Sequence, residues 1–150
     1  MIQLSKAVEA VLSFNNGFNC SQAVFSTYSE QLGLDKETAL KIASPFGAGM
    51  GRMAETCGAV TGAYMLIGLK YGKHLSYDNV AKEKSYELVG KFNDHFNTIH
   101  GSICCRDLLQ YDLNTEEGLN YIRENGLWES LCPIFIKDSA QIIEKLLDLG

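Results

Sequence analysis

Apolar residues recur at spacings of three and four along almost the whole chain, and no segment alternates strictly between apolar and polar residues as a half-buried strand would. This pattern predicts amphipathic helices joined by short connections. The predicted helices cover about 4–14, 20–32, 36–43, 56–71, 77–99, 115–124 and 133–149, with a short additional segment at 103–110. We therefore predict an all-α fold, a compact bundle of about seven helices that forms a single domain over residues 1–150.

The predicted helix at 56–71 is apolar on nearly every side. A helix of this kind lies at the centre of its domain, because it has no polar face to turn toward water. Gly58, Gly62 and Gly68 lower its intrinsic helix propensity by about 1 kcal/mol each relative to alanine. We expect them to let a neighbouring helix or a cofactor approach closely.

The charge pattern excludes several classes of partner. The formal net charge is −5, and no basic stripe interrupts the mixed charges. This argues against nucleic acid or an anionic membrane surface as the main partner. The most apolar stretch, 63–69, is far shorter than the roughly 20 residues of a membrane span, and the first residues do not resemble a secretion signal. We expect a cytoplasmic protein that does not insert into a membrane.

Five cysteines carry the candidate chemistry: Cys20, Cys57, Cys104, Cys105 and Cys132. Cytoplasmic thiols stay reduced, so such cysteines are more often ligands or catalysts than structural disulfides. Each lies at the start of a predicted helix; Cys132, for example, precedes a proline, which is favoured at the first helical position. The N–H groups of a helix start stabilise a thiolate, so we expect acidic and reactive thiols.

The sequence spacing of the cysteines leaves three interpretations open. No Cys-x-x-Cys motif is present, so the sulfurs can meet only through tertiary structure. Sulfur at four helix starts favours an iron–sulfur cluster or another metal. One alternative is a metal-free thiol–disulfide or peroxide oxidoreductase, in which Cys57 attacks and Cys105 or Cys20 resolves the intermediate. A third is a soft-metal-binding protein without catalysis. His100 is the one histidine placed to add a ligand, although a histidine there is more often a helix cap.

A glycine-rich segment at 46–52 contains Gly47, Gly49 and Gly51. It matches neither the dinucleotide-binding fingerprint nor the phosphate-binding loop, and no predicted strand precedes it. Its backbone N–H groups are candidates for a nest that binds an anion or a cluster sulfide. The alternative is a flexible bend that leads into the central helix.

Several segments together resemble one family of redox-active proteins, labelled C_GCAxxG_C_C. They are NCSQAV at 19–24, FGAGMGR at 46–52, CGAVTG at 57–62, GSICCRDLL at 101–109 and CP at 132–133. The resemblance extends from about residue 18 to the C-terminus. It implies that the four family cysteines are Cys20, Cys57, Cys105 and Cys132, and that Cys104 is additional.

The resemblance also implies redox activity with a bound prosthetic group, such as an iron–sulfur cluster, and an electron-transfer or oxidoreductase partner protein. We therefore assign metal or cluster binding to the four family cysteines, with further cofactor contacts from Gly47, Gly49 and Gly51. Cys57 and Cys105 are the candidate catalytic residues. If the protein is an enzyme, we expect an oxidoreductase.

Overall fold

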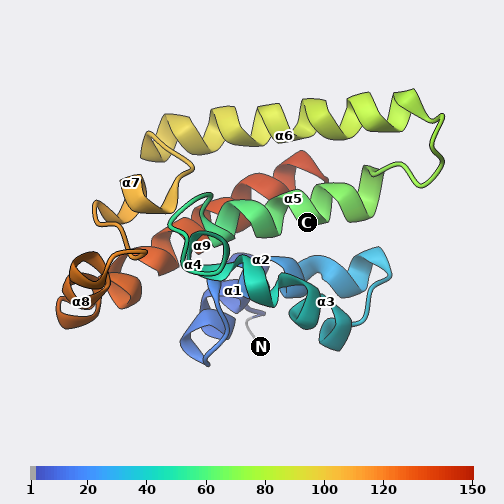
Figure 1. The fold of residues 1–150 in the computed structure, drawn as a ribbon. Coiled ribbons are helices and arrows are strands. Elements are labelled where there is room, and N and C mark those ends of the chain that lie inside the picture. The colour runs from blue at the N-terminus through green and yellow to red at the C-terminus, as the bar shows by residue number, and fades with distance from the viewer. Residues whose placement is uncertain (1–2) are drawn as a thin grey trace.

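The computed structural model describes residues 3–150 and confirms the predicted all-α fold (Figure 1). Within these residues no strand forms, and one isolated antiparallel bridge joins Thr56 to Cys104. The α-helices are α1 (Lys6–Asn15), α2 (Cys20–Ser29), α3 (Lys36–Ala43), α4 (Gly47–Met50), α5 (Gly58–Tyr71), α6 (Asn79–His100), α7 (Cys105–Leu109), α8 (Glu116–Glu124) and α9 (Leu127–Leu146). Two short 3₁₀ turns, η1 (Glu30–Leu32) and η2 (Ser44–Phe46), follow α2 and α3.

Polar side chains fix where most of the long helices begin. At α2, Asn19 and Gln22 form a capping box, in which each side chain accepts a hydrogen bond of 2.9 Å from the other residue's backbone N–H. The N-caps of the other capped helices also accept backbone hydrogen bonds; they are Ser5, Asp35, Asp78 and Thr115. A cap of this type contributes about 1 kcal/mol to helix stability.

The last helix differs from the prediction. It begins at Leu127, not at Pro133, and the proline lies inside it. Pro133 lacks the N–H that would donate to the carbonyl of Glu129 one turn earlier. The preference of proline for a first helical position is therefore misleading here. As a consequence, Cys132 lies in the second turn of α9, and the predicted helix start at this cysteine is wrong.

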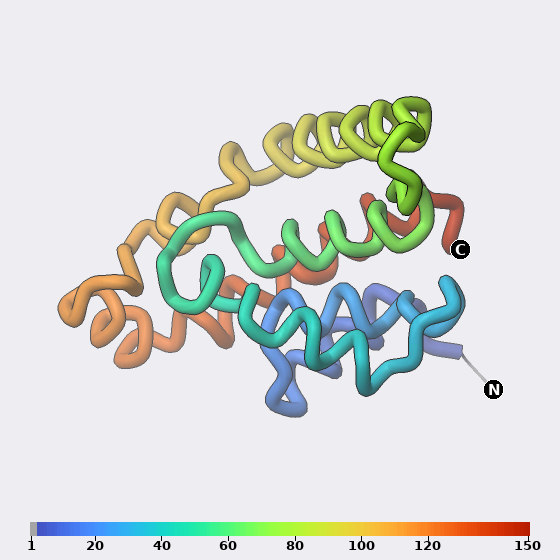
Figure 2. Tube along the Cα trace, turned by 45° about the vertical axis from the view of Figure 1, so that its right-hand side comes forward, coloured from blue at the N-terminus to red at the C-terminus, as the bar shows by residue number. Residues whose placement is uncertain are grey.

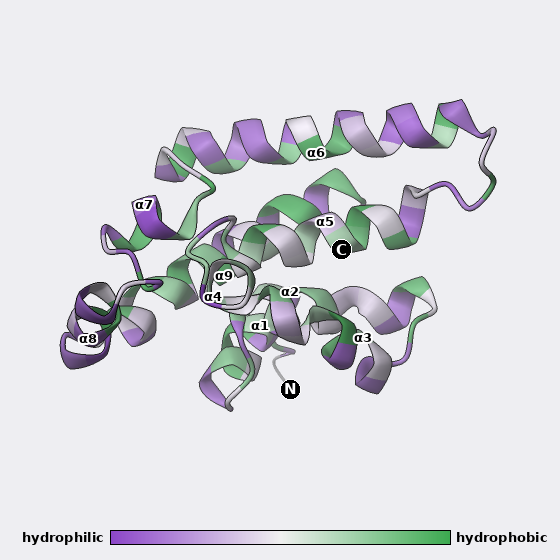
Figure 3. Ribbon diagram, viewed as in Figure 1, coloured by the Kyte–Doolittle hydropathy of each residue, from purple (hydrophilic) through white to green (hydrophobic). Residues whose placement is uncertain are grey.

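Helix α5 is central, as predicted. It packs against α2 on one side, against α6 on another and against α9 (Figures 1 and 2). Ala59, Val60, Ala63 and Leu66 are completely buried. In Figure 3 the outer surfaces of α6 and α8 are largely hydrophilic, whereas α5 shows little hydrophilic colour before its last turn. Among the described residues, no helix is both long enough and apolar enough to span a membrane.

Two of the three glycines of α5 serve the contact with α2. A Cβ atom on Gly58 would lie 2.9 Å from the backbone nitrogen of Ser21, and one on Gly62 would lie 2.8 Å from the carbonyl oxygen of Ser21. A side chain at either position would collide with the backbone of α2. Gly58 and Gly62 thus allow a neighbouring helix, α2, to approach closely, as predicted. Gly68 does not, because it has no neighbour within 4 Å of its Cβ position.

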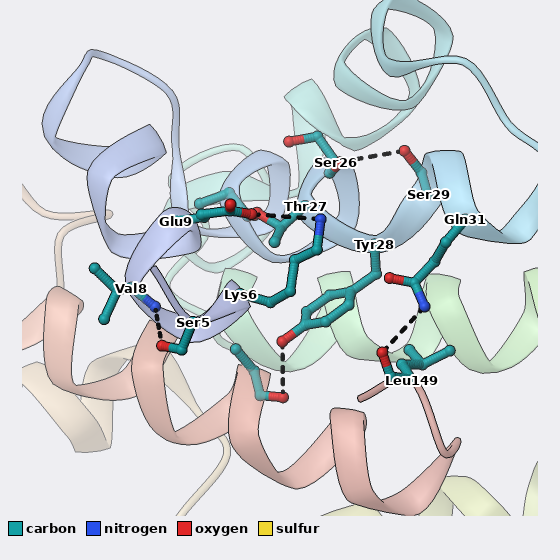
Figure 4. A network of polar contacts seen from close by, with 12 residues as sticks. Ser5, Lys6, Val8, Glu9, Ser26, Thr27, Tyr28, Ser29, Gln31 and Leu149 are labelled. Carbon is teal, nitrogen blue, oxygen red and sulfur yellow. Dashed lines mark hydrogen bonds and ion pairs between the residues drawn. The ribbon is translucent and has the colours of Figure 1, made fainter. Parts of the chain in front are cut away.

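Buried and half-buried hydrogen bonds connect the helices that surround this contact. The hydroxyl of Tyr28 on α2 donates to the carbonyl of Ala140 on α9, at 3.3 Å (Figure 4). The amide of Gln31 donates to the carbonyl of Leu149, at 3.1 Å, and the hydroxyl of Ser139 donates to the carbonyl of Ala59 on α5, at 2.6 Å. These bonds hold α2, α5 and α9 in a fixed relation.

Candidate functional site

One cavity of about 880 Å³ lies where α2, α5, α7 and α9 begin. Cys20, Cys57, Cys105 and Cys132 all line it, and each is between 5% and 8% exposed. Cys20 is the first residue of α2, Cys57 is the N-cap of α5, and Cys105 is the first residue of α7. The chain thus brings together four cysteines that are distant in the sequence. Gly47, Gly49 and Gly51 line the same cavity.

Cys104 does not line this cavity. It is the N-cap of α7 and is half-buried. Its thiol donates to the carbonyl of Ala54, at 3.3 Å. The fifth sulfur therefore contacts the backbone beside the cavity and does not line it.

A short antiparallel pairing holds Cys57 beside Cys105. The N–H of Cys57 donates to the carbonyl of Ile103, at 2.8 Å, and the N–H of Cys105 donates to the carbonyl of Glu55, at 2.6 Å. The side chains of Arg106 and Glu55 form an ion pair of 2.5 Å across this pairing. No local pattern predicts this pairing, because the paired segments are only a few residues long and do not alternate between apolar and polar residues.

The segment before this pairing adopts an unusual backbone conformation. All residues from 48 to 52 have positive φ, between 57° and 72°. Ala48, Gly49 and Gly51 also have ψ between 37° and 45°, and the N–H of Gly51 donates to the carbonyl of Gly47, at 2.9 Å. The glycine-rich segment therefore forms a left-handed helical turn. Left-handed conformations cost about 1–2 kcal/mol for each residue other than glycine, and such strain is typical of functional sites.

Only glycine fits at position 49 of this turn. A Cβ atom there would lie 2.7 Å from the backbone of Ala54, in a conformation with φ of +66°. At Gly47 a Cβ atom would overlap the side chain of Asn19, which caps α2 and donates to the carbonyl of Ser44 at 2.8 Å. The turn is thus packed tightly against the residues that position Cys20.

The expectation of acidic thiols is wrong for three of the four cavity cysteines. Burial raises the pKa of Cys57 to about 12, and the N–H groups of Ala59 and Val60 lower it only in part. Burial, followed by the charges of Cys57 and Cys20, raises the pKa of Cys105. Hydrogen bonding to the Cys132 thiol, followed by burial, raises the pKa of Cys20 well above its usual range. Loss of water and proximity to other sulfurs outweigh the helix starts.

The four sulfurs share a cavity but do not surround one point. Within residues 3–150, no three side chains of cysteine, histidine, aspartate or glutamate form a group that would hold a single metal ion. His100 supplies no accessory ligand, since its Nε2 lies 2.8 Å from Asp138 and its ring packs against Phe96 and Phe135.

A protein-family model described as "Putative redox-active protein (C_GCAxxG_C_C)" matches residues 18–146. The chain belongs to this family. The four cysteines that carry the C_GCAxxG_C_C resemblance are the four that line the cavity, and the family is described as redox-active. No curated protein and no solved structure matches the chain.

Proposed function

We propose that this C_GCAxxG_C_C protein transfers electrons through an iron–sulfur cluster held by Cys20, Cys57, Cys105 and Cys132. The observation that carries the proposal is the arrangement of four buried thiols from four helices around one cavity, with no three of them grouped for a single ion among residues 3–150. A single zinc ion needs all of its sulfur ligands about 2.3 Å from one centre. A cluster spreads its thiolates over several irons, and so suits sulfurs that stand further apart.

The raised thiol pKa values support a cationic occupant. Four thiolates in a buried cavity repel one another, and burial is the largest cause of the raised pKa of both Cys57 and Cys105. Metal ions supply the positive charge that allows such thiols to ionise, and their binding releases the protons. The donor set is therefore chemically suited to a metal group.

The chain's own residues would tune such a group. When bound, an iron–sulfur cluster supplies one-electron chemistry, with a potential set by burial and by hydrogen bonds to its sulfurs. Gly47, Gly49 and Gly51 line the cavity. The backbone N–H groups of Gly47 and Gly49 are candidate sources of these hydrogen bonds, whereas the N–H of Gly51 donates to the carbonyl of Gly47. The pairing between 55–57 and 103–105 would keep two ligands in place.

Metal-free thiol chemistry is the second candidate, and the interaction between Cys20 and Cys132 favours it. Two neighbouring thiols such as these can form a reversible disulfide. However, a Cys57 thiol with a pKa of about 12 is ionised in only about one molecule in 10⁵ at pH 7. The proposed nucleophile of the metal-free mechanism is therefore weak in this conformation.

Anaerobic purification followed by iron, zinc, copper and sulfide analysis tests the proposal. We expect iron and acid-labile sulfide together with broad visible absorbance and a reversible midpoint potential. Zinc or copper without a potential would contradict the proposal in favour of soft-metal binding. A colourless, metal-free protein that reduces peroxide or disulfides would contradict it in favour of thiol chemistry.

A further inference from the structure

The cavity is larger than the inorganic group that four cysteines would hold. Its volume of about 880 Å³ falls within the range of organic-ligand sites, which is about 300–1,000 Å³. The residues that line the cavity differ in how deeply they are buried. The four cysteines are buried, whereas Phe18, Arg52 and Glu129 are exposed and belong to the rim. The proposed function does not use the space between the four cysteines and the rim.

Aromatic rings supply much of the apolar lining. They belong to residues of three segments: Phe14 near the end of α1, Phe18 in the connection between α1 and α2, and Trp128 and Phe135 in the first turns of α9. Planar conjugated molecules pack well against aromatic side chains, because stacked and edge-on contacts add to the burial of apolar area.

The rim carries one positive charge without a partner. Arg52 ends the left-handed turn, lines the cavity, and forms no ion pair with any of the described residues. Glu129 is the carboxylate on the rim, but its Oε2 lies 3.6 Å from the Cβ position of Gly126, the N-cap of α9. Glu129 thus belongs to the first turn of its own helix, where negative charge is favoured, and it forms no ion pair with Arg52. Among the described residues that line the cavity, Arg52 is therefore the cation available to an anionic ligand.

We infer that the outer part of the cavity binds a planar, conjugated organic anion, with its acidic group at Arg52 and its rings between the aromatic side chains. A guanidinium pairs well with carboxylate and sulfonate groups, because its N–H donors form a planar fork. The role of this ligand as electron acceptor or donor rests on the proposed function, whereas its binding does not.

The protein contains a natural probe for this site. Trp128 is the only tryptophan in the sequence and lines the cavity. Titration of the anaerobically purified protein with anthraquinone-2-sulfonate should therefore quench tryptophan fluorescence to saturation, with calorimetry giving the affinity. Arg52→Gln should weaken binding about tenfold. Lys73→Gln, which removes an equal charge from the exposed connection between α5 and α6, should leave the affinity unchanged.

Three results would overturn the inference: no saturable binding, equal affinity in Arg52→Gln, or equally tight binding of the uncharged 2-(hydroxymethyl)anthraquinone. The titration is repeated on protein stripped of metal. Arg52-dependent binding by a protein that never contains iron would support the inference and contradict the proposed function. Iron and sulfide in a protein that does not bind the anion would support the proposed function and overturn the inference.

Discussion

The first turn of α5 and its last turns have different surroundings, although they belong to one regular helix. At the first turn Cys57 caps the helix, Gly58 meets the backbone of α2, and the preceding residues pair with 103–105. Near the last turn, Gly68 has no neighbour within 4 Å of its Cβ position. Close packing and irregular backbone are therefore concentrated at the end of the helix that carries sulfur.

Backbone strain is also concentrated near the first turn of α5. Four residues other than glycine have positive φ between 48 and 54: Ala48, Met50, Arg52 and Ala54. They precede the first turn of α5, and two of them line the cavity. Residues in such conformations persist only where surrounding contacts impose them. The sulfur-bearing end of α5 is therefore built at a cost in stability that the opposite end avoids.

The largest expected effect separates the cavity cysteines from the fifth one. Cys57→Ser should remove nearly all bound iron and visible absorbance, because serine is a poor substitute for a thiolate ligand. Cys104→Ser is the matched control and should retain both, since this thiol contacts the Ala54 carbonyl outside the cavity. Metal analysis of the two purified variants measures the effect. Greater loss of iron in Cys104→Ser would mean that the sulfur assignment is wrong.

Two glycine substitutions in α5 test the packing difference directly. Gly62→Ala should lower the free energy of unfolding by about 1–3 kcal/mol, because its Cβ would overlap the Ser21 carbonyl. Gly68→Ala should raise it by up to about 1 kcal/mol, since the position is helical, exposed and open. Urea unfolding of both variants gives the two values. Similar effects at the two positions would contradict the proposed asymmetry of α5.

The raised thiol pKa values predict how pH changes the stability of the metal-free protein. The Cys57 thiol has a pKa of about 12 in the folded protein, against an ordinary value of 9.0. The folded state keeps this proton where the unfolded chain loses it, so the stabilisation is complete below about pH 9 and is lost as pH rises toward 12.

For this one thiol the free energy of unfolding should fall by up to about 1.4 kcal/mol per pH unit above pH 9. Urea unfolding at about pH 7, 9 and 10.5 measures the slope. Cys57→Ser removes the titrating group and should give a shallower slope. An identical slope in that variant would show that burial of this thiol does not govern the pH dependence.

The smallest effect concerns the left-handed turn. Ala48→Gly should raise the free energy of unfolding by about 0.5–1 kcal/mol, because glycine adopts positive φ without steric cost. Ala81→Gly, in the right-handed first turn of α6, should lower it by up to about 1 kcal/mol. Thermal and urea unfolding compare the two variants. Destabilisation of equal size in both would argue against strain at residue 48.

The helices could be predicted from sequence because their signals are local. Apolar spacing and polar caps such as Asn19, Asp35 and Thr115 act within one or two turns, and the observed helices follow them. The central position of α5 also follows from its composition, since a helix without a polar face must be covered. The five cysteines are candidate site residues from their positions at predicted helix starts, and the family resemblance separates the four that line the cavity from Cys104.

The remaining features depend on contacts between distant segments. Pro133 lies inside α9, although its residue type favours a helix start. Ala48 and Met50 have positive φ, although both residue types prefer negative φ, so no local signal predicts the left-handed turn. The raised pKa of Cys57 depends on burial by other helices, which outweighs the helix start that the sequence indicates.

Cluster binding by the four cavity cysteines is tested most directly by a crystal structure of the anaerobically purified protein with anomalous data collected at the iron absorption edge. We predict an iron signal inside the cavity, within bonding distance of Cys20, Cys57, Cys105 and Cys132. Crystals without iron in the cavity, or with iron bound at Cys104 instead, would contradict cluster binding at these four residues.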